Sequence, residues 1–126
     1  MENTITQFNK ISFQLLEELS EMTDLPKIKM GKSVLRNMIQ TEPEKPIERF
    51  ILEVLPHKKE ILDKNEEFFI NYQVESNEQS FVKELITMKS LWSSLSEENR
   101  NIVFQYLTQL CKAGEHYFKL FLENKN

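Results

Sequence analysis

Two stretches in the last third of the chain repeat apolar residues at helical spacing, and this pattern constrains the fold most. The first runs at steps of four, three, four and three through Phe81, Leu85, Met88, Trp92 and Leu95. The second continues through Val103, Tyr106, Leu107, Leu110, Gly114, Tyr117, Phe118 and Phe121. Such steps place side chains on one face of an α-helix. The sequence therefore predicts a hairpin between a helix over 78–94 and a final helix of about 25 residues, roughly 38 Å long.

A short polar segment, residues 93–99, joins these two stretches and carries the signals of a helix start. Ser96 is a good N-cap residue. Glu97 and Glu98 follow it in the first turn, where a negative charge is favourable at the positive end of the helix dipole. Gly114 lies on the apolar side of the final helix, at a cost of about 1 kcal/mol relative to alanine. We therefore expect another helix to approach closely at Gly114.

The first seventy residues carry further helical patterns, and prolines separate them. Residues 4–23 predict a helix capped by Asn3 or Thr4 and ended at Pro26, because proline disfavours helix for the residue before it. A second helix, starting at Gly31 or Lys32, is expected within 27–40, from the apolar residues Ile28, Met30, Val34, Leu35, Met38 and Ile39. A third begins near Pro46 and is kinked or broken at Pro56. The segment 57–70 predicts helix with a break near residues 63–65, and a loop follows over 71–77.

Composition agrees with a helical protein that buries a core. The 126 residues include only two Gly and four Pro, and 40% are hydrophobic, with nine Phe. A chain of this length is long enough for one domain with a sizeable core. We predict an all-α fold: a single-domain helical bundle over residues 1–126, with five or six helices and a long C-terminal helix.

The compartment is expected to be cytoplasmic. Cys111 is the only cysteine, so an intrachain disulfide framework is excluded and a reducing environment is favoured. The first residues, Met1-Glu2-Asn3-Thr4, do not resemble the apolar core of a signal peptide. No stretch approaches the roughly 18 uninterrupted apolar residues of a membrane span. These observations predict a soluble protein without a membrane partner.

Cysteine and histidine residues, which often serve in catalysis or metal binding, are few, and their spacing does not match that of known catalytic or metal sites. Cys111 and His116 are five residues apart, which places them about 140° apart around a helix and on different sides. Neither His57 nor His116 follows a glutamate at the spacing of carboxylate di-iron bundles, and no Cys-x-x-Cys, His-Glu-x-x-His or glycine-rich phosphate loop occurs. We predict no catalytic, cofactor-binding or metal-binding residue, and a protein that is not an enzyme. An active site assembled from isolated Glu, Lys or Tyr residues stays open as an alternative.

Charge is unevenly distributed along the chain, whose net charge is −4. Residues 26–36 contain four basic residues and no acidic one: Lys27, Lys29, Lys32 and Arg36. An acidic chain repels phosphate backbones overall, which argues against general nucleic-acid packaging. The basic segment is either a solvated helix face or a patch for an anionic partner. Trp92, Tyr106, Tyr117 and Phe118 could stack on bases, but their helical spacing favours core packing.

The second half of the chain carries a recurring order of motifs. Phe50–Leu55 comes first, followed by Glu66-Glu67-Phe68-Phe69, then Leu91-Trp92-Ser93-Ser94-Leu95-Ser96, then Tyr106-Leu107-Thr108-Gln109-Leu110. Over residues 47–118 this order resembles small helical proteins of nucleocytoplasmic large DNA viruses, which are mostly of unassigned function. The resemblance implies a viral protein made in the host cytoplasm and packaged in the virion. It carries no catalytic residues.

These observations predict a non-enzymatic helical protein-interaction or assembly protein, acting as a minor virion component of a large DNA virus. It would dock through a helix face onto a protein partner, or associate with itself. The alternative is a nucleic-acid-associated protein that contacts phosphates through the basic segment 27–36.

Overall fold

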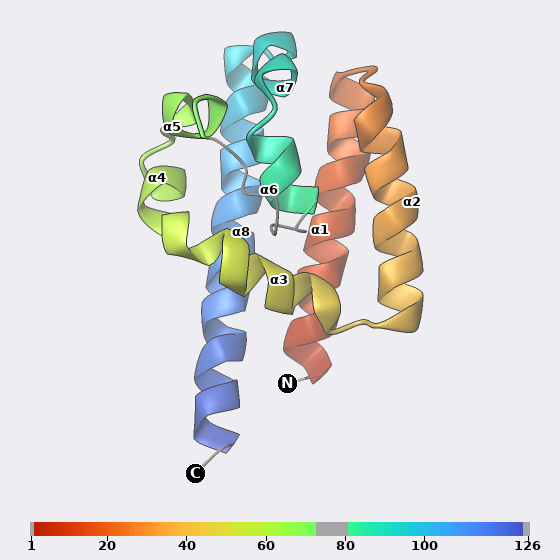
Figure 1. Cartoon of the computed structure of the whole chain (residues 1–126), viewed down its shortest axis with the longest axis vertical. Helices are drawn as coiled ribbons and strands as arrows, with labels where there is room; N and C mark the ends of the chain where they lie inside the picture. The colour runs from red at the N-terminus through yellow and green to blue at the C-terminus, as the bar shows by residue number, and fades with distance from the viewer. Residues whose placement is uncertain (1, 73–80, 125–126) are drawn as a thin grey trace.

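The computed structural model describes residues 2–72 and 81–124, and every regular element within them is a helix (Figure 1). The predicted all-α class is therefore confirmed. In chain order the elements are α1 (Glu2–Met22), α2 (Pro26–Thr41), α3 (Lys45–Glu53), the 3₁₀ turn η1 (Leu55–His57), α4 (Lys58–Leu62), α5 (Glu66–Ile70), α6 (Phe81–Ile86), α7 (Lys89–Ser94) and α8 (Glu97–Asn124). From residue 73 on, the loop expected over 71–77 lies outside the described residues, and so do the side chains of Phe81 and Val82.

The described residues form eight α-helices, more than the five or six expected, partly because the helix predicted over 78–94 is divided. Met88 is extended, with φ −79° and ψ 115°, and separates α6 from α7. The indole nitrogen of Trp92 donates a buried hydrogen bond of 2.7 Å to the backbone carbonyl of Ile86. In a continuous helix that carbonyl would accept from the backbone four residues later. The break thus lets Trp92 be buried with its polar nitrogen satisfied.

The partner of the long C-terminal helix also differs from the prediction. The most extensive contacts of α8 are with α1, which runs alongside it, and then with α3 and α4 (Figure 1). α6 and α7 pack mainly on each other, on α3 and on α5. Two short helices with a bend between them do not offer α8 a long straight face, whereas α1 is 21 residues long. The hairpin predicted between 78–94 and α8 is therefore wrong as the organising pair.

Several local signals of the sequence are confirmed. α1 ends at Met22, before Pro26, and α3 ends at Glu53, ahead of Pro56. The expected start of the second helix at Gly31 or Lys32 is wrong, because α2 already begins at Pro26, whose fixed φ suits the first turn of a helix. Residues 63–65 separate α4 from α5, with Lys64 in the left-handed region at φ 53°. Ser96 Oγ accepts a hydrogen bond of 3.1 Å from the backbone N–H of Asn99, which is the predicted N-cap. At the N-terminus, by contrast, α1 already includes Asn3 and Thr4, the residues expected to precede it.

The buried apolar side chains form one cluster to which α1, α2, α3, α7 and α8 all contribute. Phe8 of α1 meets Phe50 of α3 edge-on at 5.3 Å between ring centroids, and Trp92 stacks on Phe104 of α8 at 5.0 Å. The close approach expected at Gly114 is present. A Cβ there would lie 3.6 Å from Phe50 and 3.5 Å from Ile51, so α3 crosses α8 at this glycine.

Candidate functional site

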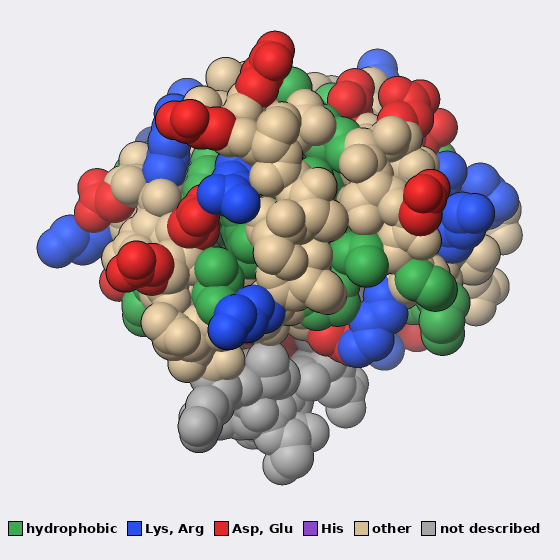
Figure 2. Space-filling view, turned by 90° about the horizontal axis from the view of Figure 1, so that it is seen from above, with side chains coloured by type: hydrophobic (Ala, Val, Ile, Leu, Met, Phe, Trp, Pro, Cys, Tyr) green, Lys and Arg blue, Asp and Glu red, His purple; other side chains and the backbone are tan. Residues whose placement is uncertain are grey.

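The basic segment predicted as an anionic-partner patch lies on α2, and the structure divides it. Lys29, Lys32 and Arg36 follow one another at steps of three and four, which places them on one side of the helix. Lys32 Nζ and Arg36 Cζ lie 5.7 and 5.3 Å from the ring centroid of Phe13 on α1. Seen from above, Lys and Arg side chains gather at the right-hand edge of the molecule, where α2 lies (Figure 2).

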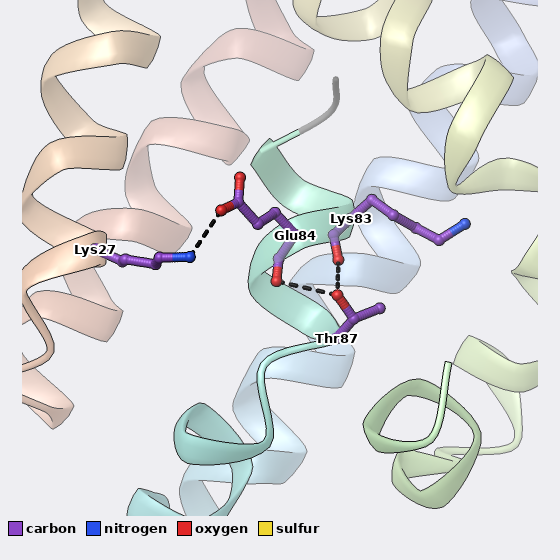
Figure 3. A network of polar contacts seen from close by, with 4 residues as sticks. All are labelled: Lys27, Lys83, Glu84 and Thr87. Atoms are coloured by element: carbon purple, nitrogen blue, oxygen red, sulfur yellow. Dashed lines mark hydrogen bonds and ion pairs between the residues drawn. The ribbon is translucent and has the colours of Figure 1, made fainter. Parts of the chain in front are cut away.

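Lys27 is separate from this group. Its Nζ lies 2.9 Å from Glu84 Oε1 on α6, and the two side chains point toward each other across the space between the helices (Figure 3). Both side chains are more than half exposed, so this ion pair contributes little to stability. The patch available to an anion is therefore Lys29, Lys32 and Arg36.

The same ion pair spans a groove between α2 and α6, here called the α2–α6 groove. Its volume is about 250 Å³, and it is lined by Lys27, Met30, Gly31, Val34, Glu84, Leu85 and Met88. Met30 and Val34, expected to be on the apolar face of this helix, are 66% and 49% exposed. Small-molecule pockets usually measure about 300–1,000 Å³. This groove is smaller and mostly apolar, which suits one or two protruding side chains better than a cofactor.

A second exposed apolar surface lies at the end of α8. Phe118, Phe121 and Leu122 are 47%, 40% and 47% exposed and form what we call the α8 ridge. The last turns of α8 extend beyond the neighbouring helices at the lower end of the molecule (Figure 1). Phe118 was predicted to pack in the core with Trp92 and Tyr117. That prediction is confirmed for Trp92 and Tyr117, which are buried, and wrong for Phe118.

The ridge continues a seam that is buried farther up the same helix. Steps of three and four lead from Phe104 through Leu107, Cys111 and Gly114, all buried, to Phe118 and Phe121. Next to the α3 crossing, polar contacts hold α8 on both sides of this seam. Tyr117 donates a hydrogen bond of 3.4 Å to the Glu48 carboxylate, and Lys58 Nζ lies 2.8 Å from Glu115. Burial, and then the Glu48 charge and hydrogen bond, raise the pKa of Tyr117.

Sequence patterns missed one buried charged residue, Lys83 of α6, which is 1% exposed. Its Nζ donates a hydrogen bond of 2.7 Å to the backbone carbonyl of Glu53 and lies 4.1 Å from the ring centroid of Tyr72. Figure 3 shows the Lys83 side chain pointing away from Lys27 and Glu84. Lys83 thereby ties α6 to the end of α3. The interior is thus not wholly apolar. The contacts of Lys83 with the Glu53 carbonyl and the Tyr72 ring are those of a structural anchor.

The other side chains that could react or bind a metal do not form a site. Cys111 is buried, and desolvation, with the nearby Glu115 charge, raises the pKa of its thiol to about 12. A thiol with this pKa is almost fully protonated at neutral pH, and the thiolate is the reactive form. His116 is exposed on α8. Within residues 2–72 and 81–124, no three or more His, Cys, Asp or Glu side chains are grouped to hold a metal ion.

Comparison with known proteins offers no template for these surfaces. No family model, curated protein or solved structure matches the chain. Of the described helices, none has both the length and the apolar character needed to cross a membrane. Function is therefore inferred from the exposed residues themselves.

Proposed function

We propose that this protein is a non-enzymatic helical assembly protein that binds a protein partner, or further copies of itself, through an exposed helix face. The observation that carries the proposal is the α8 seam, which is buried as far as Gly114 and exposed at Phe118 and Phe121. The first part of this seam is enclosed among α1, α3, α4 and α7, whereas Phe118 and Phe121 in its last part are 47% and 40% exposed.

The residue types of the ridge support an interaction role. Fully burying one Phe or Leu side chain contributes about 1.5–3 kcal/mol relative to exposure. Single exposed apolar residues are ordinary on protein surfaces. Three large ones lie together on one face of the last two turns, at helical spacings of three and four. Aromatic side chains are also common anchors of interfaces.

We also propose that the protein is a minor component of the virion of a large DNA virus. This part is supported by the sequence resemblance over residues 47–118. Its test is mass spectrometry of purified virus particles, in which the chain should co-purify with the capsid after protease treatment of the particle surface. Loss of the chain during that treatment would contradict this assignment.

The interaction role is tested with the double variant Phe118→Glu and Leu122→Glu, which places charges on the ridge without touching the core. Leu52→Glu is the matched control, because Leu52 is 68% exposed on α3 outside the ridge and the groove. We expect wild type and the control to self-associate in sedimentation velocity, or to cross-link to the same protein partner in cells. The ridge variant should lose both. A wild type that stays monomeric and has no ridge-dependent partner would contradict the proposal.

A second candidate function is contact with nucleic-acid phosphates, favoured by the shared face of Lys29, Lys32 and Arg36. Three phosphate contacts predict that the logarithm of affinity falls with the logarithm of salt with a slope of about −2.7 on duplex DNA. Replacing all three with Gln should remove binding, whereas Lys27→Gln should leave it unchanged because Lys27 lies on the other side of α2. Absence of binding at low salt would remove this candidate.

A further inference from the structure

We infer that a groove between α4 and α8, here called the α4–α8 groove, binds the phosphate group of a small molecule. Its volume is about 300 Å³, at the lower end of the range of small-molecule sites. α4 lies beside α8 (Figure 1). Lys58 Nζ lies 2.8 Å from Glu115 at one end, and Lys64 Nζ donates a hydrogen bond of 3.3 Å to Asn101 Oδ1 at the other. These contacts hold the walls of the groove together.

The groove is positively charged, although the protein has a net charge of −4. Lys64 and Lys112 line it, and none of the described carboxylates does. Neither ammonium group forms an ion pair with a described residue. Glu115, one turn from Lys112, is already paired with Lys58, and Asp63 does not line the groove. Two like charges at one groove repel each other, and a bound anion removes this repulsion.

Two glutamines supply neutral hydrogen-bond donors to the same groove. Gln105 and Gln109 are one turn apart on α8 and both line it. Each side-chain amide has two N–H donors, and no hydrogen bond ties either amide to another described residue. Thr108 adds no donor, because its hydroxyl donates to the Phe104 carbonyl at 2.8 Å. The groove therefore offers two ammonium groups and two amides to an anion.

The backbone of Lys64 gives an independent reason to assign this residue a role. Of the described non-glycine residues it alone has a positive φ, 53°. Its N–H bonds to the Ile61 carbonyl at 3.1 Å, and that of Asn65 bonds to the Glu60 carbonyl at 2.9 Å. Helices often end in this way, and glycine is favoured at the left-handed position because a Cβ there is strained. Strained residues cluster at ligand sites, and here the strained residue carries a groove-lining ammonium group.

The donor set fits phosphate better than a carboxylate. A phosphate monoester carries a charge of about −1.5 to −2 at pH 7 and three acceptor oxygens. The two ammonium groups match this charge, and the glutamine amides match the remaining oxygens. A carboxylate has only one charge and two oxygens. Leu62, which is 50% exposed and lines the groove, offers an apolar contact to an organic group attached to the phosphate.

Titrating the ¹⁵N-labelled full chain with inorganic phosphate and with phenyl phosphate tests the inference by NMR. We expect saturable shifts of the Lys64 backbone N–H and of the Gln105 and Gln109 side-chain amides, with a Kd of about 1 mM or tighter. Tighter binding of phenyl phosphate would identify an organic phosphate whose apolar group contacts Leu62. Equal binding of the two probes would identify free phosphate as the ligand.

A pair of matched variants shows whether the groove is the site. Lys64→Gln with Lys112→Gln should weaken binding by about tenfold or more, because both charges are lost. Lys59→Gln with Lys119→Gln removes the same charge from exposed lysines outside the groove. At physiological salt this control should change the Kd by less than about twofold, because charges outside the groove are screened. Circular dichroism should show the wild-type helix content for both variants.

Lys64→Gly separates a binding role from a structural one. Glycine relieves the strain at φ 53°, so thermal denaturation should show a higher midpoint than wild type. The same variant should bind phenyl phosphate about fivefold more weakly or worse, because one ammonium group is lost. Higher stability with unchanged phosphate binding would mean that Lys64 is not part of a ligand site, and would overturn the inference.

Two further outcomes overturn it. One is the absence of shifts at the groove with both probes at about 20 mM, well above the expected Kd. The other is an equal loss of binding in the groove variant and in the Lys59 and Lys119 control, which would show attraction to overall charge alone. Neither outcome bears on the α8 ridge, because the ridge and the groove share no residue. The inference goes beyond the proposed function and is tested separately from it.

Discussion

The two halves of α8 share one apolar seam and have opposite environments. In the first half, Phe104, Leu107 and Cys111 are at most 2% exposed, enclosed among α1, α3, α4 and α7. In the second half, Phe118 and Phe121 are 47% and 40% exposed. The boundary is Gly114, where α3 crosses. The spacing of a helical stripe therefore tells which residues share a face, but not how far a neighbouring element covers that face.

The largest expected effect tests this comparison directly, with the same substitution in each half. Phe104→Ala should lower the free energy of unfolding by about 3–5 kcal/mol, because it leaves a cavity beside Trp92. Phe118→Ala should lower it by only about 1 kcal/mol, because the ring is about half in solvent and loses only part of the contribution of full burial. Urea denaturation of both variants measures the difference. Equal losses would mean that the end of α8 is covered in solution.

The next effect concerns the anchor that ties α6 to α3, the helix that crosses α8 at Gly114. Lys83→Ala should lower the free energy of unfolding by about 2–4 kcal/mol, because it removes a buried donor and leaves the Glu53 carbonyl without this bond. Lys83→Met keeps the length of the side chain without its charge and should cost less. If both substitutions were neutral in urea denaturation, Lys83 would not be an anchor.

A smaller effect depends on pH and arises from Cys111 in the buried half of the seam. Burial raises the pKa of its thiol from near 9 in the unfolded chain to about 12 in the folded one. The folded state thus holds this proton more tightly. The contribution of this pKa difference to the free energy of unfolding is fully present below pH 9 and is lost as pH rises toward 12. At pH 10.5 the free energy of unfolding should be lower by on the order of 1–2 kcal/mol.

Cys111→Ala removes this contribution, so the variant should show a flatter decline of stability between pH 8 and pH 10.5 than wild type. Tyr106 and Tyr117, whose pKa values are also raised, leave some decline in both proteins. A thiol reagent at pH 8 provides an independent check. It should react with Cys111 only when urea unfolds the chain, and rapid reaction with the folded protein would contradict the burial of this residue.

The smallest effect is at the boundary itself. Gly114→Ala adds a Cβ in ordinary van der Waals contact with Phe50 and Ile51 and improves helix propensity. We expect the free energy of unfolding to rise by about 0.5–1 kcal/mol. Thermal denaturation should show a correspondingly higher midpoint. A lower midpoint would mean that α3 and α8 are too close to admit a methyl group, and that the glycine is required by packing.

The candidate site was predicted only in part. Residues 26–36 are basic in sequence, but only tertiary structure separates Lys27, which pairs with Glu84, from the other three. The groove was hidden because Met30 and Val34 belong to the same apolar pattern as the buried Ile28 and Leu35. Lys83 carries no sequence signal, since a lysine inside a helical stretch is ordinarily solvated.

By itself the sequence determined the helical class, the end of the first helix before Pro26, the helix start at Ser96, and the breaks at Pro56 and residues 63–65. Those features follow from local causes: apolar spacing, the fixed geometry of proline and side-chain capping of backbone N–H groups. Tertiary structure decided that α8 pairs with α1, that Trp92 closes the break between α6 and α7, and that the seam is exposed beyond Gly114. These outcomes depend on which segments far apart in the chain compete to cover one apolar face, and the periodicity of a single helix holds no information about its competitors.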